Sequence, residues 1–216
     1  MIYLDNAATT FPKPPEVISA MTELMRDYGG NPGRGGHRLS RLCGEKVFEC
    51  RESMAKLLGV SNPERIIFTK NATEALNLAI KGSVNRGDEI IISSMEHNSV
   101  LRSAVSLEKN GVTVKIARAD NTGLVSAEAV MRAITPRTKL ICVTHASNVV
   151  GTVNPIEDIC RMARARNILT LIDCAQTGGI LPINGDVLDM AAFAGHKGLY
   201  GPFGTGVLYI REGITL

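Results

Sequence analysis

The sequence predicts an α/β protein built in three layers, with helices on both faces of a mainly parallel sheet. Helical and strand patterns alternate from about Pro14 to the end of the chain, which is typical of α/β folds. The strand patterns are continuous apolar runs, and strands of that kind are buried on both faces. A length of 216 residues suits one large domain or slightly more.

Two helices are expected before the first strand. Pro14 and Pro15 open the first helix, and Gly29 and Gly30 end it. The second helix ends at Gly59, and the spacing of its apolar stripe predicts that one face lies against the sheet. The apolar face of the first helix is Val17, Ile18, Met21, Leu24 and Met25, and the stripe of the second is Leu39, Leu42, Cys43, Val47, Cys50, Met54 and Leu57.

Short apolar segments after Gly59 are expected to form the strands. They are residues 65–69, 89–92, 112–116, 139–143, 168–172 and 206–210, and a further apolar run, 190–195, leads to His196 and Lys197. Ligands of parallel sheets bind beyond the carboxyl ends of the strands. The polar residues that follow these segments are therefore the candidates for a functional site.

Charge and composition argue against several classes of protein. Lys and Arg total 24 against 21 Asp and Glu, and the basic residues are scattered, so a nucleic-acid partner is not expected. The segment Gly33-Arg34-Gly35-Gly36-His37-Arg38 could suggest RNA contact, but it is short and lacks interleaved aromatic residues.

Membrane insertion and secretion are not expected either. No apolar run approaches the length of a membrane span, and residues 1–5 lack the organisation of a signal peptide. The five cysteines form no CxxC pair, which predicts neither a disulfide frame nor a metal site and suits a reducing compartment. The expected location is the cytoplasm.

The segment Thr69 to Glu74 is a candidate anion site. Asn71 and Glu74 have the spacing of a capping box before a helix with Leu76 on its apolar face. A well-capped helix is the simpler interpretation, but its first N–H groups and the Thr73 hydroxyl could also hold a phosphate. No Walker glycine-lysine loop is present, so such a phosphate is expected to belong to a cofactor.

A lysine and an acid complete a possible cofactor site. Asp173 ends an apolar run, where a buried carboxylate needs a cation or hydrogen-bond donors. Taken alone, Lys197 would be interpreted as a surface lysine. The glycines that follow it, however, would let the backbone approach a bound group closely, so that the amine can be desolvated. A lysine, an acid and a phosphate site together suit pyridoxal phosphate. His97, His145 and Asn148 also follow strands, although a lone loop histidine carries little weight.

Five segments, in order, carry a resemblance to a known family. They are Tyr3 to Thr10, Thr69 to Glu74, Glu96-His97-Asn98, Ser147-Asn148 with Gly151-Thr152, and Asp173 to Gln176 with His196-Lys197 and Gly201-Pro202. With them the chain resembles the class V aminotransferases, which are fold type I pyridoxal phosphate enzymes. The cysteine desulfurase and selenocysteine lyase branch is the most similar. The resemblance implies that the chain is the large cofactor domain of that fold.

The resemblance also implies roles for individual residues. Lys197 would bond covalently to the cofactor, and the Ala72 N–H, Thr73 and His196 would hold the phosphate. Around the ring, Asp173 would pair with the pyridine nitrogen, and His97 would stack on the ring and move protons. Gln176 would donate to the ring hydroxyl, and Asn148 would lie beside the ring and the substrate. Segments 5–8 and 31–37 match pieces that border the active site, often across a dimer interface. Ala194 departs from the better-known desulfurases, which carry a hydroxyl residue there as a phosphate ligand.

By resemblance, the expected function is that of a cysteine desulfurase, a transferase of iron–sulfur cluster assembly that acts as a homodimer with L-cysteine as substrate and a sulfur-acceptor protein as partner. A class V aminotransferase, a selenocysteine lyase and a non-catalytic fragment that binds pyridoxal phosphate are the alternatives.

The expected organisation is an N-terminal segment, 1–14, that borders the active site and a cofactor domain, 15–216. The family's C-terminal small domain, with its sulfur-accepting cysteine and carboxylate-binding arginine, is expected to be absent. No cysteine follows Lys197, and Cys174 is interpreted as a packing residue. Weak or absent desulfurase activity is expected of this chain alone.

Overall fold

The structure is a computed structural model of the 216-residue chain, and it describes residues 2–34 and 36–216. Met1, the first residue of the segment that lacks signal-peptide character, lies outside the described residues. Gly35, part of the Gly33 to Arg38 segment considered for RNA contact, lies outside them too.

A seven-stranded sheet forms the centre of the molecule, in the order β1-β7-β6-β5-β4-β2-β3. The pairs that β2 forms with β3 and β4 are parallel, as are β4 with β5 and β5 with β6, whereas β7 is antiparallel to both of its neighbours. The predicted mainly parallel sheet is therefore confirmed. The strands are β1 (Ile66–Thr69), β2 (Glu89–Ser93), β3 (Thr113–Ala117), β4 (Thr138–Thr144), β5 (Leu169–Asp173), β6 (Met190–Ala194) and β7 (Gly206–Ile210).

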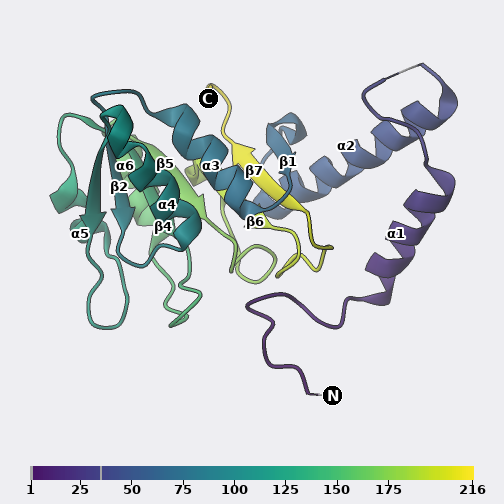
Figure 1. Cartoon of the computed structure of the whole chain (residues 1–216), viewed down its shortest axis with the longest axis horizontal. Helices are drawn as coiled ribbons and strands as arrows, with labels where there is room; N and C mark the ends of the chain where they lie inside the picture. The colour runs from purple at the N-terminus through teal and green to yellow at the C-terminus, as the bar shows by residue number, and fades with distance from the viewer. Residues whose placement is uncertain (1, 35) are drawn as a thin grey trace.

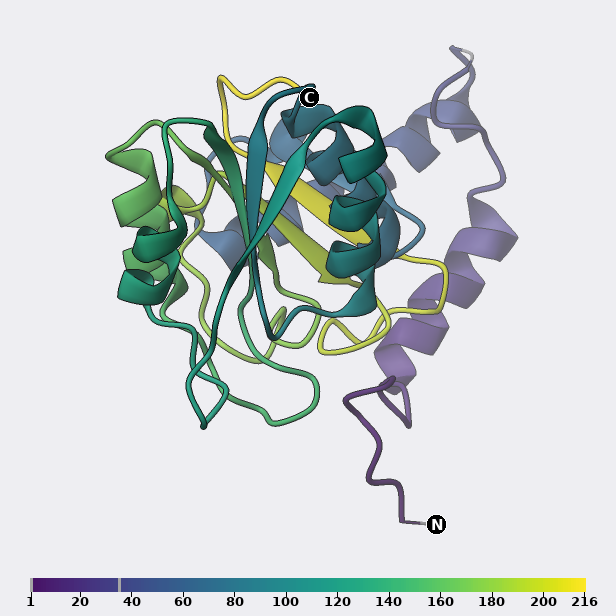
Figure 2. The ribbon, with the colours of Figure 1, turned by 60° about the vertical axis from the view of Figure 1, so that its left-hand side comes forward.

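Helices cover both faces of the sheet, as Figure 2 shows. On one face, α3 (Ala72–Ser83) and α4 (Asn98–Ser106) share an apolar cluster with β2, β4 and β6. On the other face, α5 (Ala127–Ala133), α6 (Ile156–Arg164) and the last turns of α2 (Arg38–Leu58) form a second cluster. Short 3-10 turns lie at Pro63–Arg65, Glu108–Asn110 and Gly185–Val187. The three-layer prediction is confirmed.

The strands begin and end within one or two residues of the predicted segments, and their burial follows their place in the sheet. Every residue of β2, β6 and β7 is buried. The edge strands β1 and β3 are partly open, and Phe68 and Ile116 lie exposed on them. Continuous apolar runs thus predict central strands well, and the same pattern also occurs at the two edges of this sheet.

The predicted packing of α2 is largely wrong. Of its apolar stripe only Met54 is buried, whereas Leu39 and Leu57 are 45% and 47% exposed. The reason is geometric, because the buried apolar residues of α2 lie at its C-terminal end, where Met54, Ala55 and Leu58 join the cluster on the sheet. The preceding helix, α1 (Pro15–Asp27), buries none of its residues and ends before the predicted Gly29 stop. In Figure 1, α1 and the start of α2 extend away from the sheet.

The topology gathers strand ends at one edge of the sheet. Because β7 runs against both β1 and β6, β1 is parallel to β6, and the carboxyl ends of β1, β2, β4, β5 and β6 share that edge. The start of β7 lies there as well. Residues from far-apart parts of the sequence therefore meet at this edge, as expected for a ligand site in an open α/β sheet.

Candidate functional site

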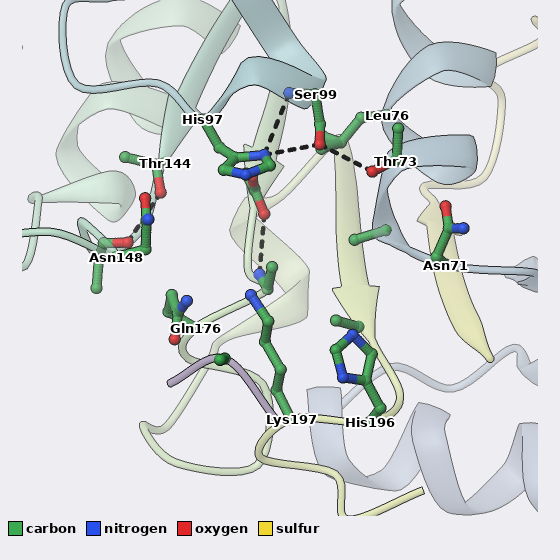
Figure 3. Close-up of a pocket in the computed structure, with 16 residues that line it drawn as sticks. Asn71, Thr73, Leu76, His97, Ser99, Thr144, Asn148, Gln176, His196 and Lys197 are labelled. Atoms are coloured by element: carbon green, nitrogen blue, oxygen red, sulfur yellow. Dashed lines mark hydrogen bonds between the residues drawn. The ribbon is translucent and has the colours of Figure 1, made fainter. Parts of the chain in front are cut away.

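A pocket of about 240 Å³ lies at this edge of the sheet. All eight residues that the sequence singled out for a cofactor line it. Figure 3 shows Lys197 reaching in from one side, with His97 and Ser99 opposite it. The lining residues are Ala8, Asn71, Ala72, Thr73, Leu76, His97, Ser99, Thr144, Ala146, Asn148, Asp173, Ala175, Gln176, Ala194, His196 and Lys197.

The start of α3 forms the anion-binding side of the pocket. Asn71 caps the helix, because its Oδ1 accepts from the Glu74 N–H at 2.8 Å, and Glu74 Oε2 accepts from the Lys70 N–H at 2.7 Å. The capping-box spacing is thus confirmed, with Glu74 reaching one residue further back than usual. Within the described residues, the N–H groups of Ala72 and Thr73 have no recorded acceptor. They point out of the positive end of the helix dipole, which favours an anion.

His196 adds a polar atom to this side. Its Nδ1 is buried and has no hydrogen-bond partner among the described residues. Burial, together with the charges of Lys197 and Lys13, lowers the pKa of His196. A neutral imidazole with one unpaired nitrogen is suited to a single hydrogen bond with an anionic oxygen.

Asp173 and Lys197 face the pocket from β5 and from the loop after β6. Asp173 Oδ1 accepts from the Ala175 N–H at 2.9 Å. Burial raises the pKa of Asp173, while the Ala175 N–H and the positive charges of Lys197 and His97 oppose that rise. Burial also lowers the pKa of Lys197, with Asp173 acting in the opposite direction. The amine therefore spends more time neutral and nucleophilic than an exposed lysine would.

His97 is the N-cap of α4, on the turn where the sequence placed it. Its Nδ1 accepts from the Ser99 N–H at 3.2 Å, so the neutral ring carries its proton on Nε2. The Ser99 hydroxyl lies 2.8 Å from this Nδ1 and 2.8 Å from the Thr73 hydroxyl. One short chain of polar groups thus connects the anion side of the pocket to His97 (Figure 3). Sequence reasoning missed Ser99, and its only signal is a hydroxyl two residues after a capping histidine.

Glu96 is a second residue whose role emerges only from the structure. Its Oε1 accepts from the Thr144 N–H at 2.7 Å and from the Ser93 hydroxyl, so it ties the ends of β4 and β2 together directly before His97. The residue as a whole is half-buried, but Oε2 is shielded from solvent and has no partner among the described residues. Burial raises the pKa of Glu96 to about 8, and the nearby charge of Asp173 adds to the rise.

The remaining candidates separate into lining and core residues. Gln176 lines the pocket and donates from Nε2 to the Ala7 carbonyl at 3.1 Å. His145 is buried, and its Nδ1 lies 2.9 Å from the Thr177 hydroxyl, so it is a core histidine. Cys174 is completely buried, in agreement with a packing role. None of the five cysteines is among the residues that line the pocket.

The donor set fits pyridoxal phosphate. Unpaired N–H groups, a hydroxyl and a neutral imidazole lie on one side for a phosphate, and a carboxylate lies at a strand end for a protonated ring nitrogen. A lysine with a lowered pKa and an exposed histidine complete the set. Across residues 2–34 and 36–216, no three His, Cys, Asp or Glu side chains gather in a way that could hold a metal ion.

No helix within the described ranges is both long and apolar enough to cross a membrane.

Comparison with known proteins identifies relatives of the chain along its whole length. The probable cysteine desulfurase of Methanothermobacter thermautotrophicus is 39% identical over 211 residues, 96% of this chain and 52% of that protein. The cysteine desulfurase IscS of Serratia proteamaculans is 40% identical over 219 residues, 98% of this chain and 54% of that protein. The chain thus spans about half the length of the curated relatives it matches.

Solved structures show the same fold. The apo structure of a cysteine desulfurase from Thermococcus onnurineus NA1 has a TM-score of 0.91 and 36% identity, covering 98% of this chain and 54% of that one. A structure titled "SspA in complex with cysteine" has a TM-score of 0.92 and 37% identity, covering 98% of this chain and 62% of that one. The family model described as aminotransferase class-V matches residues 2–215. The chain therefore belongs to the class V aminotransferase family.

Proposed function

We propose that this chain carries the pyridoxal phosphate site of a cysteine desulfurase. The observation that supports the proposal most strongly is the meeting of Lys197, Asp173 and the start of α3 in one pocket. A nucleophilic amine, a partner for a ring nitrogen and a phosphate cradle are required together by this cofactor, and each comes from a different strand end. The names of the relatives support cysteine as the substrate.

The chain's own residues would bind and orient the cofactor. Ala72, Thr73 and His196 would hold the phosphate, Asp173 would pair with the ring nitrogen, and Lys197 would form the covalent bond. When bound, pyridoxal phosphate supplies an electron sink next to the amino group of the substrate. Asp173 would keep the ring nitrogen protonated, because the anion faces it from a buried position.

His97 and two amide side chains would act on the open face of the pocket. The hydrogen-bond pattern at Nδ1 leaves the proton of the neutral His97 ring on Nε2, from which it can be given to a substrate atom. Gln176 is held in place through the Ala7 carbonyl and would donate to the ring hydroxyl. Asn148 is exposed at the mouth, where it would meet the substrate.

The proposed reaction removes sulfur from L-cysteine. The carbon–sulfur bond breaks, the sulfur is transferred to an acceptor thiol as a persulfide, and alanine is released, so cysteine and a thiol give alanine and a persulfide. No cysteine lines the pocket, so the acceptor thiol would come from another part of the protein or from a partner. By resemblance, we further propose a homodimer, a cytoplasmic location, a sulfur-acceptor protein and a place in iron–sulfur cluster assembly.

The first experiment tests the cofactor site. The purified chain is incubated with pyridoxal phosphate, reduced with borohydride and weighed by mass spectrometry, beside Lys197→Ala and the control Lys109→Ala, which replaces an exposed lysine. We expect one adduct on the wild type and on Lys109→Ala, and none on Lys197→Ala. A folded wild type that takes up no cofactor would contradict the proposal.

A second experiment tests the reaction. L-cysteine and dithiothreitol are added to the loaded chain, and alanine and sulfide are measured. We expect slow, Lys197-dependent release of alanine, because the pocket supplies no thiol of its own. A 2-oxo acid without alanine would instead identify an aminotransferase. In a parallel assay with L-selenocysteine, turnover of selenocysteine but not of cysteine would identify a selenocysteine lyase.

A further inference from the structure

The N-terminal strap, defined here as residues 3–13, is attached to the two residues that present the proposed cofactor lysine. The His196 carbonyl accepts from the Thr9 hydroxyl at 3.0 Å, the Thr10 hydroxyl at 3.1 Å and the Thr10 N–H at 3.1 Å. The Lys13 ammonium adds a fourth donor at 3.0 Å. These four groups share one carbonyl oxygen, across a separation of more than 180 residues in the sequence.

The strap also holds the other side of Lys197. The Thr10 hydroxyl lies 3.1 Å from the Lys197 carbonyl, which accepts in addition from the Tyr200 N–H at 2.8 Å. The carbonyls before and after the Lys197 Cα are therefore both anchored. Fixing both peptide planes fixes the direction of the Cα–Cβ bond between them, and hence the region that the Lys197 amine can reach.

Lys13 determines which way the Thr10 hydroxyl can point. The Lys13 Nζ lies 2.7 Å from Thr10 Oγ1, and an ammonium group can only donate. The Thr10 hydroxyl must therefore accept from Lys13 and turn its single proton toward the carbonyls of His196 and Lys197. No carboxylate lies within 4 Å of Lys13 among the described residues. Its hydrogen bonds go to the Thr10 hydroxyl and the His196 carbonyl, and its charge also lowers the pKa of the His196 imidazole.

The strap is itself an ordered structure. The Tyr3 hydroxyl donates to the Thr9 carbonyl at 2.9 Å, and the Tyr3 and Phe11 rings pack edge to face at 5.6 Å. Asn6 Oδ1 accepts from the Phe11 N–H at 3.1 Å. Thr10 is buried, with an exposed fraction of 6%. These contacts give the Thr10 and Lys13 donors a fixed frame, which a loose terminal segment would not provide.

We propose that Thr10 and Lys13 are positioning residues that hold Lys197 in its desolvated, cofactor-facing place. This inference rests on the proposed role of Lys197. In Figure 3 the strap passes beside the backbone from which Lys197 rises into the pocket. The hydrogen bonds from Thr10 and Lys13 to His196 and Lys197 all end on backbone carbonyls, so these bonds influence the chemistry of the amine through its location.

The test uses two removals and one rescue in the full chain. Thr10→Val removes the hydroxyl at constant volume, Lys13→Met removes the ammonium, and Thr10→Ser restores the hydroxyl. Lys109→Met serves as the charge control. Borohydride trapping at graded concentrations of pyridoxal phosphate measures the affinity at Lys197, and thermal unfolding verifies the fold of each variant. Loss of a charged hydrogen bond predicts affinities weaker by about tenfold in Thr10→Val and Lys13→Met, with recovery in Thr10→Ser.

A second readout needs no cofactor. Acetic anhydride labels the Lys197 amine at a rate that follows its neutral fraction, so labelling from pH 7 to pH 11 gives its pKa. The charged and titratable groups that face the amine are Asp173 from β5, His97 from the turn after β2, and His196 beside it. All three side chains are retained in every variant, and Thr10→Val, which removes no charge, separates the effect of location from the effect of the Lys13 charge on His196. In Thr10→Val and Lys13→Met the amine should move toward water, and its pKa should rise toward that of an ordinary lysine.

The two proposals fail in different ways. If the wild type takes up no pyridoxal phosphate but Thr10→Val changes the labelling profile and Thr10→Ser restores it, the cofactor assignment is wrong and the strap inference stands. If folded Thr10→Val and Lys13→Met show the wild-type labelling profile and the wild-type affinity, the strap inference is overturned.

Discussion

Glu96 is a half-buried acid whose carboxyl group has one oxygen shielded from solvent. Its carboxyl group joins the ends of β2 and β4 through Ser93 and the Thr144 N–H, and a second carboxyl group, Asp173, lies near enough to raise its pKa. Burial raises the pKa of both acids, but the positive charges of Lys197 and His97 favour the charged form of Asp173, which faces the pocket.

Stability should therefore depend on pH through Glu96. The pKa of Glu96 rises from 4.5 to about 8 on folding, so the folded state holds more protons between these values, and the free energy of unfolding falls as pH rises across that window. Glu96→Gln should remove a slope of up to about 1.4 kcal/mol per pH unit. Urea unfolding from pH 4 to pH 9 measures it, with the exposed Glu108→Gln as control. Parallel curves for Glu96→Gln and wild type would refute the assignment.

Ser99 connects the start of α3 to His97. Its hydroxyl lies between the Thr73 hydroxyl and His97 Nδ1, and its N–H also donates to that Nδ1. Ser99→Ala should keep the backbone contact and lose the hydroxyl. The affinity for pyridoxal phosphate should then weaken several-fold, as expected for one hydrogen bond near an anion, at nearly unchanged thermal stability.

The imidazole of His97 provides a direct measurement of the same change. Nitrogen NMR of the chain without cofactor should show Nε2 protonated in both the wild type and Ser99→Ala, because the backbone N–H still donates to Nδ1, and the Nδ1 resonance should shift in Ser99→Ala because the hydroxyl contact is lost. Ser53→Ala, on the exposed face of α2, is the matched control. An unchanged ring and unchanged affinity in Ser99→Ala would remove Ser99 from the site.

The residues proposed to contact a ligand directly could be identified from the sequence, whereas those proposed to act through other residues could not. Lys197, Asp173 and Thr73 follow apolar runs, and a parallel sheet brings such positions together. In the sequence, Glu96, Ser99 and Lys13 are ordinary polar residues without a distinguishing pattern. Their proposed roles depend on contacts that the fold creates with a strand end, a hydroxyl and a carbonyl, respectively. Their partners depend on tertiary distances, which no local pattern contains.

At the level of elements, the pocket depends on a close approach between β7 and the start of α3. A Cβ on Gly206, the first residue of β7, would clash with the backbone of Asn71, the N-cap of α3. The glycine is therefore required by contact with a neighbouring backbone. The N–H groups proposed to bind phosphate follow directly after this contact.

Gly206→Ala should consequently damage stability and the anion site together. Overpacking of this kind costs about 1 to 3 kcal/mol, and the displaced helix start should weaken the affinity for pyridoxal phosphate. Gly29→Ala is the matched control, because a Cβ there meets nothing within 4 Å. Urea unfolding and borohydride trapping of both variants test the prediction, and wild-type behaviour of Gly206→Ala would contradict it.

The elements themselves were predictable to different degrees. Strand bounds follow from local apolar runs and glycine or polar ends, and β2, β4 and β5 lie within two residues of their predicted segments. The stripe of α2 was correctly recognised as amphipathic, yet most of it is not buried. Periodicity shows that a helix has an apolar face, but it does not show whether another surface lies opposite that face.

At the level of the whole molecule, buried apolar residues are distributed unevenly over the described part of the chain. The two apolar clusters lie on the faces of the sheet, whereas α1 has no buried residue and Ile18 and Met25 on it are 57% and 75% exposed. The free energy of unfolding of this chain should therefore come from the sheet and its covering helices, with little from α1.

A pair of substitutions tests this division. Ile18→Glu on α1 should change the free energy of unfolding by less than about 0.5 kcal/mol, as for a surface site. Leu76→Ala in α3, where the side chain is 1% exposed, should cost about 2 to 5 kcal/mol. Urea unfolding followed by circular dichroism measures both, and a large loss in Ile18→Glu would show that α1 packs on the rest of the chain.

The reversed direction of β7 has a consequence for the thermodynamics of ligand capture. Because β7 runs back along β6, the loop that carries Lys197 leaves and re-enters the sheet at one edge, and the Gly195 N–H donates to the Thr205 carbonyl at 2.9 Å to close it. The conformational entropy of that loop is thus lost when the chain folds. A small molecule that arrives later meets a lysine whose loop is already ordered, so its binding free energy does not carry that cost.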